Sequence, residues 1–255
     1  AKVLPTVGAA IEDIVERMMQ GGRLIYMGAG TSGRLGVLDA AECGPTFSVS
    51  PDEVVAFIAG GNEALRQAVE GAEDDPVAGA NDLKSISITP RDTVVGIAAS
   101  GRTPYVRGGL QYAQEVGALT VSLTCNPNSE ISAGVKYAIE VDSGPELLAG
   151  STRLKSGTAQ KLVLNMISTV TMIRLGKTFG NLMVDLQITN AKLQDRALRI
   201  IENATGATRA EATAALEASG QVVKVAILMI LLGIDADKAR ERLRGASNRI
   251  RQALD

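Results

Sequence analysis

Apolar runs alternate with helical patterns along the first two thirds of the chain. Each run is continuous rather than alternating, which is typical of strands buried on both faces of a parallel sheet. The runs lie at residues 24–27, 54–59, 93–98, 119–123 and 137–141. Because helical stretches connect them, the pattern predicts an α/β fold with a five-stranded, parallel, doubly wound sheet in the flavodoxin-like strand order 2-1-3-4-5.

After Gly150 the pattern becomes entirely helical. A long apolar helix is predicted over residues 154–175, and a second helix over residues 182–201. The last fifty or so residues have the pattern of a separate small unit. We therefore expect an α/β domain with flanking helices over residues 1–202, and a small three-helix, UBA-like domain over residues 203–255.

Signals for helix ends support this C-terminal unit. Thr208 is followed three residues later by Glu211, which is the spacing of a capping box. Gly233 is placed to end a middle helix, and Asp235 to cap the next one. The apolar run at residues 225–232 is far shorter than the ~20 residues that cross a bilayer. It predicts a buried helix rather than a membrane span.

Composition narrows the possible functions. The 255 residues carry 26 basic and 28 acidic side chains, so the formal net charge of −2 favours neither nucleic acid nor an anionic membrane as the main partner. We therefore expect a small-molecule ligand. The chain has no histidine, which excludes an imidazole base and histidine-based zinc sites. Cys43 and Cys125 lie far apart in the sequence, which predicts no disulfide, no thiolate metal site and a cytoplasmic location.

The strongest local signal directly follows the first predicted strand. Gly28, Gly30 and Gly33 allow a tight turn into a helix, whose free N–H groups and dipole favour an anion. Thr31 and Ser32 add hydroxyl groups for a terminal phosphate. The glycine spacing also fits a dinucleotide fingerprint, but the second strand does not end in the acidic residue which that site uses. We therefore expect a phosphate site.

A second loop of the same kind follows the third predicted strand. Ser100 and Gly101 are followed by Thr103, placed as an N-cap, and by Pro104 as the first helical residue. In the predicted strand order, the loops after strands 1 and 3 lie side by side where ligands bind. Either loop alone is typical of ordinary helix capping, but the pair predicts one phosphate held by both.

Longer motifs occur at several other places along the chain. They lie at residues 28–47, 70–74, 150–161 and 179–185. The two loops resemble the sugar isomerase (SIS) phosphosugar-binding fold, and with the longer motifs essentially the whole chain is similar to the N-acetylmuramic acid 6-phosphate etherases of bacterial cell-wall recycling. One departure is Gly44, where that family more often has proline. We expect the turn to tolerate this change.

This resemblance implies a carbon–oxygen lyase reaction without metal or cofactor. The D-lactyl ether at C3 of N-acetylmuramic acid 6-phosphate is cleaved by elimination and addition of water, giving N-acetylglucosamine 6-phosphate and D-lactate. Glu42 matches the residue that protonates the departing lactate, and Glu73 matches a second essential carboxylate, which we assign as the base at C2. Glu70 is expected to hold sugar hydroxyls. Two carboxylates can divide these roles when their environments separate their pKa values.

Without the resemblance, the same residues allow plainer interpretations. Glu42 would be a solvated carboxylate ending a helical pattern, and Glu70 and Glu73 would belong to an acidic run at an exposed helix end. Glu146 either faces the same crevice or is an ordinary loop acid. The basic residues nearby either neutralise an anion or form a solvated helix face. They are Arg153, Lys155 and Lys161.

Two other functions are compatible with this fold. Regulators that sense sugar phosphates resemble the etherases and bind phosphosugars without converting them. An aldose–ketose isomerase shares the removal of the C2 proton. Neither needs an acid aimed at a leaving group on C3, so Glu42 in its sequence context favours the etherase.

The position of Glu42 raises a geometric difficulty. If the helix that begins near Thr31 runs unbroken to Glu42, the two are roughly 16 Å apart along its axis, and the first obstacle to the helix is at Cys43 and Gly44. The C3 oxygen of a sugar lies less than half that far from its own 6-phosphate. We therefore expect a homodimer in which Glu42 approaches the phosphate loops of the partner, paired through the apolar helix at residues 154–175.

Overall fold

The computed structural model describes residues 1–255, and packing divides the chain into two compact units. The first unit contains Ala1–Glu42 and Ser50–Thr171, and the second contains Cys43–Val49 and Met172–Asp255. The first unit holds a parallel sheet between layers of helices. The second is helical, with one short antiparallel ribbon.

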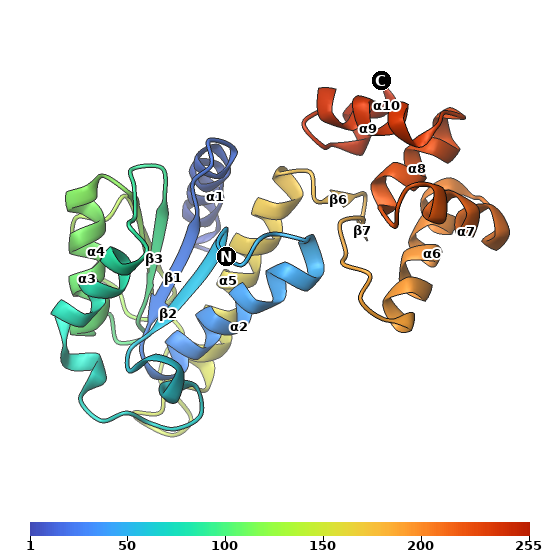
Figure 1. Ribbon diagram of the computed structural model, residues 1–255. Helices are drawn as coiled ribbons and strands as arrows, with labels where there is room; N and C mark the ends of the chain where they lie inside the picture. Colours follow the sequence, from blue (N-terminus) through green and yellow to red (C-terminus); the bar gives the residue numbers. More distant parts are fainter. The chain divides into compact units, whose positions relative to one another are not determined.

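Five parallel strands form the sheet of the first unit (Figure 1). They are β1 Leu24–Gly28, β2 Val54–Ile58, β3 Thr93–Ile97, β4 Leu119–Thr124 and β5 Tyr137–Glu140. Their order is β2-β1-β3-β4-β5, so the predicted fold class and strand order are confirmed. Every residue of β1, β3 and β4 is buried, whereas the edge strands β2 and β5 are partly exposed. This burial explains why the runs are continuous in the sequence.

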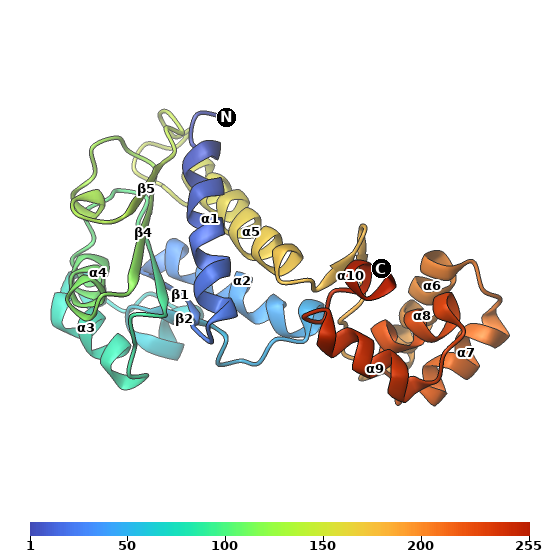
Figure 2. The ribbon, with the colours of Figure 1, turned by 90° about the horizontal axis from the view of Figure 1, so that it is seen from above.

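Helices cover both faces of this sheet. They are α1 Leu4–Met19, α2 Gly30–Phe47, α3 Pro76–Ser85, α4 Pro104–Val116 and α5 Lys155–Arg174. On one face, α3 and α4 pack over Ile25 and Met27 (Figure 2). On the other, the Tyr26 hydroxyl donates to the Asp39 carboxylate of α2 at 2.9 Å, and the Asn165 amide of α5 donates to the same carboxylate at 2.7 Å. This buried carboxylate therefore ties β1, α2 and α5 together.

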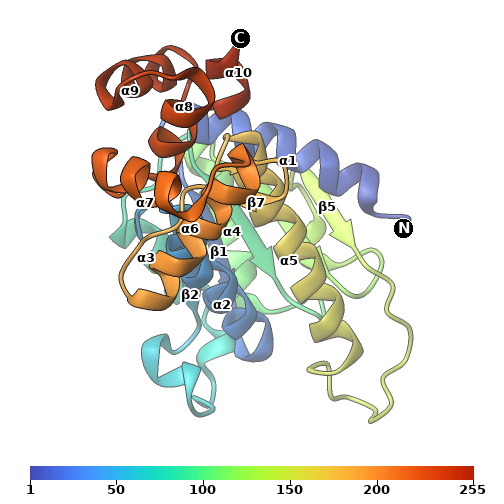
Figure 3. The same cartoon turned by 90° about the vertical axis from the view of Figure 1, so that its right-hand side faces the viewer.

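The second unit is a bundle around one apolar helix (Figure 3). Its elements are β6 Thr178–Phe179, β7 Leu182–Met183, α6 Ala191–Thr205, α7 Arg209–Ala218, α8 Val223–Leu232, α9 Ala236–Gly245 and α10 Ile250–Leu254. The central helix α8 contacts α6, α7, α9 and α10, and its first six residues are buried. The prediction of a buried helix here is confirmed. No helix is by itself long and apolar enough to cross a membrane, and α7 and α8 meet that test only jointly, with a bend of 117° between them.

The predicted helix ends of this unit are confirmed. Thr208 and Glu211 form the capping box at the start of α7. Gly233 ends α8 in a left-handed conformation with φ of 64°, and the Asp235 carboxylate accepts the N–H of Lys238 at the start of α9. These caps satisfy backbone groups that have no partner inside a helix.

The structure divides the chain earlier than the predicted boundary between residues 202 and 203. Helix α6 buries Ala197 and Ile201 in the same apolar cluster as α7 and α8, so it packs with the second unit rather than with the sheet. The helix expected from residue 182 begins at Ala191, because Leu182–Met183 forms a strand of the ribbon. The second unit therefore has five helices instead of three.

An ion pair joins the starts of β1 and β3. The Arg23 guanidinium donates to both oxygens of Asp92, at 3.0 and 2.8 Å, and the Thr89 N–H donates to the same carboxylate at 2.7 Å. Asp92 is only 2 % exposed. Burial raises the pKa of its carboxyl, but the Arg23 guanidinium and the backbone donors together outweigh burial and hold the pKa below its ordinary value. Folding is therefore coupled to ionisation of Asp92.

Replacing Asp92 by asparagine is expected to lower the free energy of unfolding by about 2–3 kcal/mol, because the charge-assisted bonds are lost. A depressed carboxyl pKa stabilises the fold above the unfolded-state value and loses that contribution as the pH falls below about 4. Urea unfolding of wild type should therefore show a larger acid loss than that of Asp92→Asn. Asp237→Asn, at a side chain 97 % exposed, is the control. Equal acid dependence in Asp92→Asn and wild type would contradict the prediction.

Candidate functional site

The turn between β1 and α2 is built by the close approach of two glycines. A Cβ atom on Gly33 would lie 2.7 Å from the Gly28 carbonyl oxygen and 2.6 Å from Cγ1 of Ile58, so no side chain fits there. Gly30 begins α2 with φ of +52° and is exposed. The N–H groups of the first helical turn thus meet open space at the positive end of the helix dipole, where an anion is stabilised.

The hydroxyl of Ser32 points away from this open space. Ser32 is 7 % exposed, and its hydroxyl donates to the Oε1 atom of Gln160 on α5 at 2.9 Å. Gln160 is fully buried, and its Nε2 atom has no hydrogen-bond partner. An unpaired buried amide is uncommon in native structures. Gln160 was not singled out in the sequence, because nothing in the pattern of an apolar helix shows which polar residue faces a distant loop.

The first turn of α5 lies beside the same loop. A Cβ atom on Gly157 would be 3.4 Å from Cγ2 of Thr31, which shows how closely the helix approaches. The Glu146 carboxylate accepts the N–H groups of Lys155 and Ser156, each at 2.9 Å, and these bonds lower the pKa of its carboxyl. Glu146 is therefore a cap of α5, which decides between the two interpretations that the sequence left open.

The second loop begins beside the first, because Gly28 of β1 pairs with Ile97 of β3. Gly101 has φ of +73°, and a Cβ atom there would lie 2.1 Å from Oγ of Ser129, so only glycine fits. Ser100 is exposed, and its hydroxyl accepts the N–H of Arg102 at 3.3 Å. The predicted placement of Thr103 before α4 is confirmed, but its side chain forms no capping bond with the helix.

A cavity of about 270 Å³ opens beside the first loop. Gly30 and Arg34 lie on one side, and a segment after β2 supplies Glu70 and Glu73 on the other. The Arg34 guanidinium holds this segment by donating to the Leu65 carbonyl oxygen at 3.1 Å. Both glutamates are exposed. The structure therefore brings Glu70 and Glu73 to the first loop, as a site for a ligand requires.

Glu42 is not brought to this cavity within the chain. Helix α2 runs without interruption from Gly30 to Phe47, so Glu42 lies roughly 18 Å along the axis from its first residue. The obstacle expected at Cys43 and Gly44 does not end the helix. Pro45 lies inside the last turn, where its missing N–H removes a single helical bond. Glu42 is exposed.

Three family models match the chain. The N-terminal SIS domain of glucokinase regulatory protein matches residues 6–114, the SIS domain matches residues 77–170, and the C-terminal lid domain of glucokinase regulatory protein matches residues 180–219. Among solved structures, a putative phosphosugar isomerase from Bacteroides fragilis has a TM-score of 0.51 at 20 % identity, covering 66 % of this chain and 79 % of its own. A phosphoheptose isomerase from Neisseria gonorrhoeae has a TM-score of 0.50 at 21 % identity, covering 66 % of this chain and 84 % of its own. These two likenesses concern the fold alone.

Curated relatives are far more similar. The N-acetylmuramic acid 6-phosphate etherase of Rubrobacter xylanophilus is 59 % identical over 254 residues, which are 100 % of this chain and 84 % of the relative. The proteins of the same name from Halalkalibacterium halodurans and Vibrio campbellii are 58 % and 57 % identical over 100 % of this chain, and the matches span 85 % and 82 % of their lengths. This chain belongs to the N-acetylmuramic acid 6-phosphate etherase family.

Proposed function

We propose that this chain cleaves the D-lactyl ether of N-acetylmuramic acid 6-phosphate, giving N-acetylglucosamine 6-phosphate and D-lactate in cell-wall sugar recycling. The observation that carries the proposal is the full-length identity of 56–59 % to etherases. The cavity beside the first loop supports it, because carboxylates there face a helix end that can hold a phosphate. Cys43 and Cys125 form no disulfide, which supports a cytoplasmic location.

The 6-phosphate is bound by backbone N–H groups at the N-terminus of α2. Gly30 and Gly33 let the backbone approach the phosphate, and the hydroxyl of Thr31 donates to its oxygens. The hydroxyl of Ser32 does so once it turns from Gln160, to which it donates in the free chain. The second loop adds Ser100, the backbone of Gly101, and Thr103.

The chemistry follows from the open-chain aldehyde of the sugar. This aldehyde makes the C2 proton acidic, and Glu73 removes that proton to leave an enolate at C2. The C3–O bond then breaks, and lactate leaves with the bonding electrons. Glu42 supplies the proton that the lactate oxygen needs. Water then adds to C3 and a proton returns to C2, so atoms and charges balance. Glu70 orients the sugar hydroxyls, and no imidazole takes part in a chain without histidine.

Glu42 acts in the site of a second copy of the chain. The length of α2 supports this, since roughly 18 Å separates Glu42 from the phosphate end of its own helix. The surface around it supports pairing as well. Leu38, one turn before Glu42, is 53 % exposed, and Leu162, Met166 and Val170 form an exposed stripe along α5. A homodimer formed through α2 and α5 would bury these side chains.

A regulator that senses sugar phosphates is the second candidate function. It is favoured by the matches to both the SIS and the lid domains of glucokinase regulatory protein. A sensor needs the phosphate loops but neither Glu42 nor Glu73. Incubation with N-acetylmuramic acid 6-phosphate, with D-lactate as the readout, separates the two functions, because a sensor releases none.

Phosphate binding is expected to depend on hydroxyls of both loops. Ser32→Ala and Ser100→Ala should each weaken binding of N-acetylglucosamine 6-phosphate about 10- to 100-fold, because a bond to a charged group contributes about 1.5–3 kcal/mol. Calorimetric titration measures this. Ser85→Ala, whose hydroxyl bonds only to a carbonyl of its own helix, is the control. Wild-type affinity in both loop variants would place the phosphate elsewhere.

The two carboxylates are expected to differ in the step that each supports. Glu42→Ala should still exchange the C2 proton with solvent deuterium but release D-lactate about 10²- to 10⁴-fold more slowly, because only protonation of the leaving oxygen is lost. Glu73→Ala should do neither. Mass spectrometry follows exchange, and Glu115→Ala, an exposed glutamate on α4, is the control. Full lactate release by either variant would remove that residue from the mechanism.

Mixing of inactive subunits tests the shared site. Glu42→Ala and Ser100→Ala chains are refolded together and purified as heterodimers with two tags. Each heterodimer should regain roughly half of the activity of a wild-type dimer. In such a heterodimer, one site keeps both an intact Glu42 and an intact Ser100. Homodimers of each variant are the controls. Verified heterodimers without activity would place Glu42 in the site of its own subunit.

A further inference from the structure

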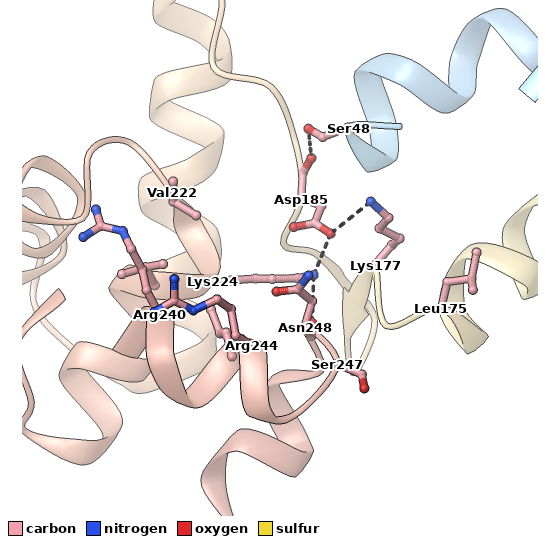
Figure 4. Close-up of a pocket in the computed structure, with 12 residues that line it drawn as sticks. Ser48, Leu175, Lys177, Asp185, Val222, Lys224, Arg240, Arg244, Ser247 and Asn248 are labelled. Carbon is pink, nitrogen blue, oxygen red and sulfur yellow. Dashed lines mark hydrogen bonds and ion pairs between the residues drawn. The ribbon is translucent and has the colours of Figure 1, made fainter. Parts of the chain in front are cut away.

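The second unit contains a cavity of its own, of about 480 Å³ (Figure 4). Lys177 lies just before the ribbon and Asp185 just after it, the start of α8 contributes Lys224, and α9 contributes Arg240 and Arg244. Apolar side chains, among them Leu175 and Leu243, line part of its wall. This volume lies in the range of small-molecule sites, which is about 300–1,000 Å³.

Most of the charged side chains that line this cavity are basic. Four basic side chains face it with a single carboxylate, that of Asp185, although the whole chain has a net charge of −2. The Arg240 guanidinium is partly compensated, since it donates to the exposed Asp237 carboxylate at 3.0 Å. The side chain of Arg244 is exposed and forms no ion pair or hydrogen bond within the chain. Basic charge in a hollow concentrates the field and attracts anions.

Lys224 is held inside the cavity wall with one donor to spare. Its side chain is 5 % exposed, and its Nζ atom donates to Asp185 at 2.6 Å and to the Asn248 carbonyl oxygen at 3.0 Å. An ammonium group has three N–H donors, so one remains. Burial lowers the pKa of Lys224, and the Asp185 carboxylate opposes that shift. The Asp185 carboxylate is also shared with Lys177, whose Nζ lies 3.8 Å away.

Residues with a strained backbone conformation line the same cavity. Six residues other than glycine have positive φ in this chain, and three of them, Ser48, Ser247 and Asn248, line this cavity. Non-glycine residues in the left-handed region are uncommon and concentrate at binding sites. The Lys224 ammonium supports the strained loop, because it donates to the carbonyl oxygen of Asn248.

We propose that this cavity binds a phosphate monoester, with the basic charge of Lys177, Lys224 and Arg244 attracting the dianion and the apolar wall lying against its carbon skeleton. Arg244 and Lys177 have donors to offer, and the cavity has room for more than an inorganic anion. A dianion offsets the excess of basic charge. The proposal does not rest on the proposed etherase activity, because the residues of this site are separate from the phosphate loops.

Calorimetric titration of the full chain tests this site, with inorganic phosphate and with N-acetylglucosamine 6-phosphate as probes. Wild type is expected to bind two equivalents of the ester per chain. Lys177→Met and Arg244→Met should each weaken the same one of these two binding events at least about tenfold, because a basic charge that attracts the dianion is lost. Ser100→Ala should weaken the other event only. Arg251→Met, an exposed arginine on α10 outside the cavity, is the control and should change neither.

Two results would overturn the proposal. If the double variant Lys177→Met/Arg244→Met binds the ester with wild-type stoichiometry and affinity, the cavity is not a phosphate site. If inorganic phosphate binds the cavity more tightly than the ester, the ligand class is wrong. Failure of the proposed etherase function is distinguishable from these two results. It would appear as absent D-lactate release and would leave the titrations of the Lys177 and Arg244 variants as expected.

Discussion

The rigid course of α2 is the constraint on which the arrangement of the candidate site depends. A hydrogen-bonded helix advances by a fixed ~1.5 Å per residue, so the separation of Gly30 from Glu42 cannot be altered by side-chain rotation. The N-terminal end of α2 is therefore flanked by groups from other segments, among them the stretch that carries Glu70 and Glu73. At the other end, the exposed Leu38 lies near Glu42, where the proposed homodimer would bury it.

The two proposed anion sites have two different kinds of positive charge. In the first unit, the charge is that of backbone N–H groups at helix ends, positioned by glycines that admit no side chain. Such groups are fixed in direction and do not titrate. In the second unit, the charge belongs to lysines and arginines, and the buried Lys224 is paired with Asp185, which opposes the lowering of its pKa by burial.

Most of the fold was predictable, because buried strands and helix caps leave local signals. The runs from Leu24 and Thr93 showed a parallel sheet, and the turn at Gly28–Gly33 followed from glycines that let the chain turn tightly into a helix. What the sequence did not show depends on contacts between distant segments. The packing of α6 with α8 and the bond from Ser32 to Gln160 arise only when the chain is folded. Likewise, proline ends many helices, yet here Pro45 occupies a last turn that tolerates one missing bond.

The placement of the two cysteines has a consequence for oxidative chemistry. Cys43 is 2 % exposed and Cys125 is 6 % exposed, and burial raises the pKa of the Cys125 thiol, which keeps it protonated. The thiolate is the form that attacks peroxides and disulfides, so Cys125 reacts poorly with both. The polar side chains that line the cavity of the first unit carry carboxylates, a guanidinium and an amide, none of which such oxidants modify. The cavity therefore keeps its chemistry when the redox state of its surroundings changes.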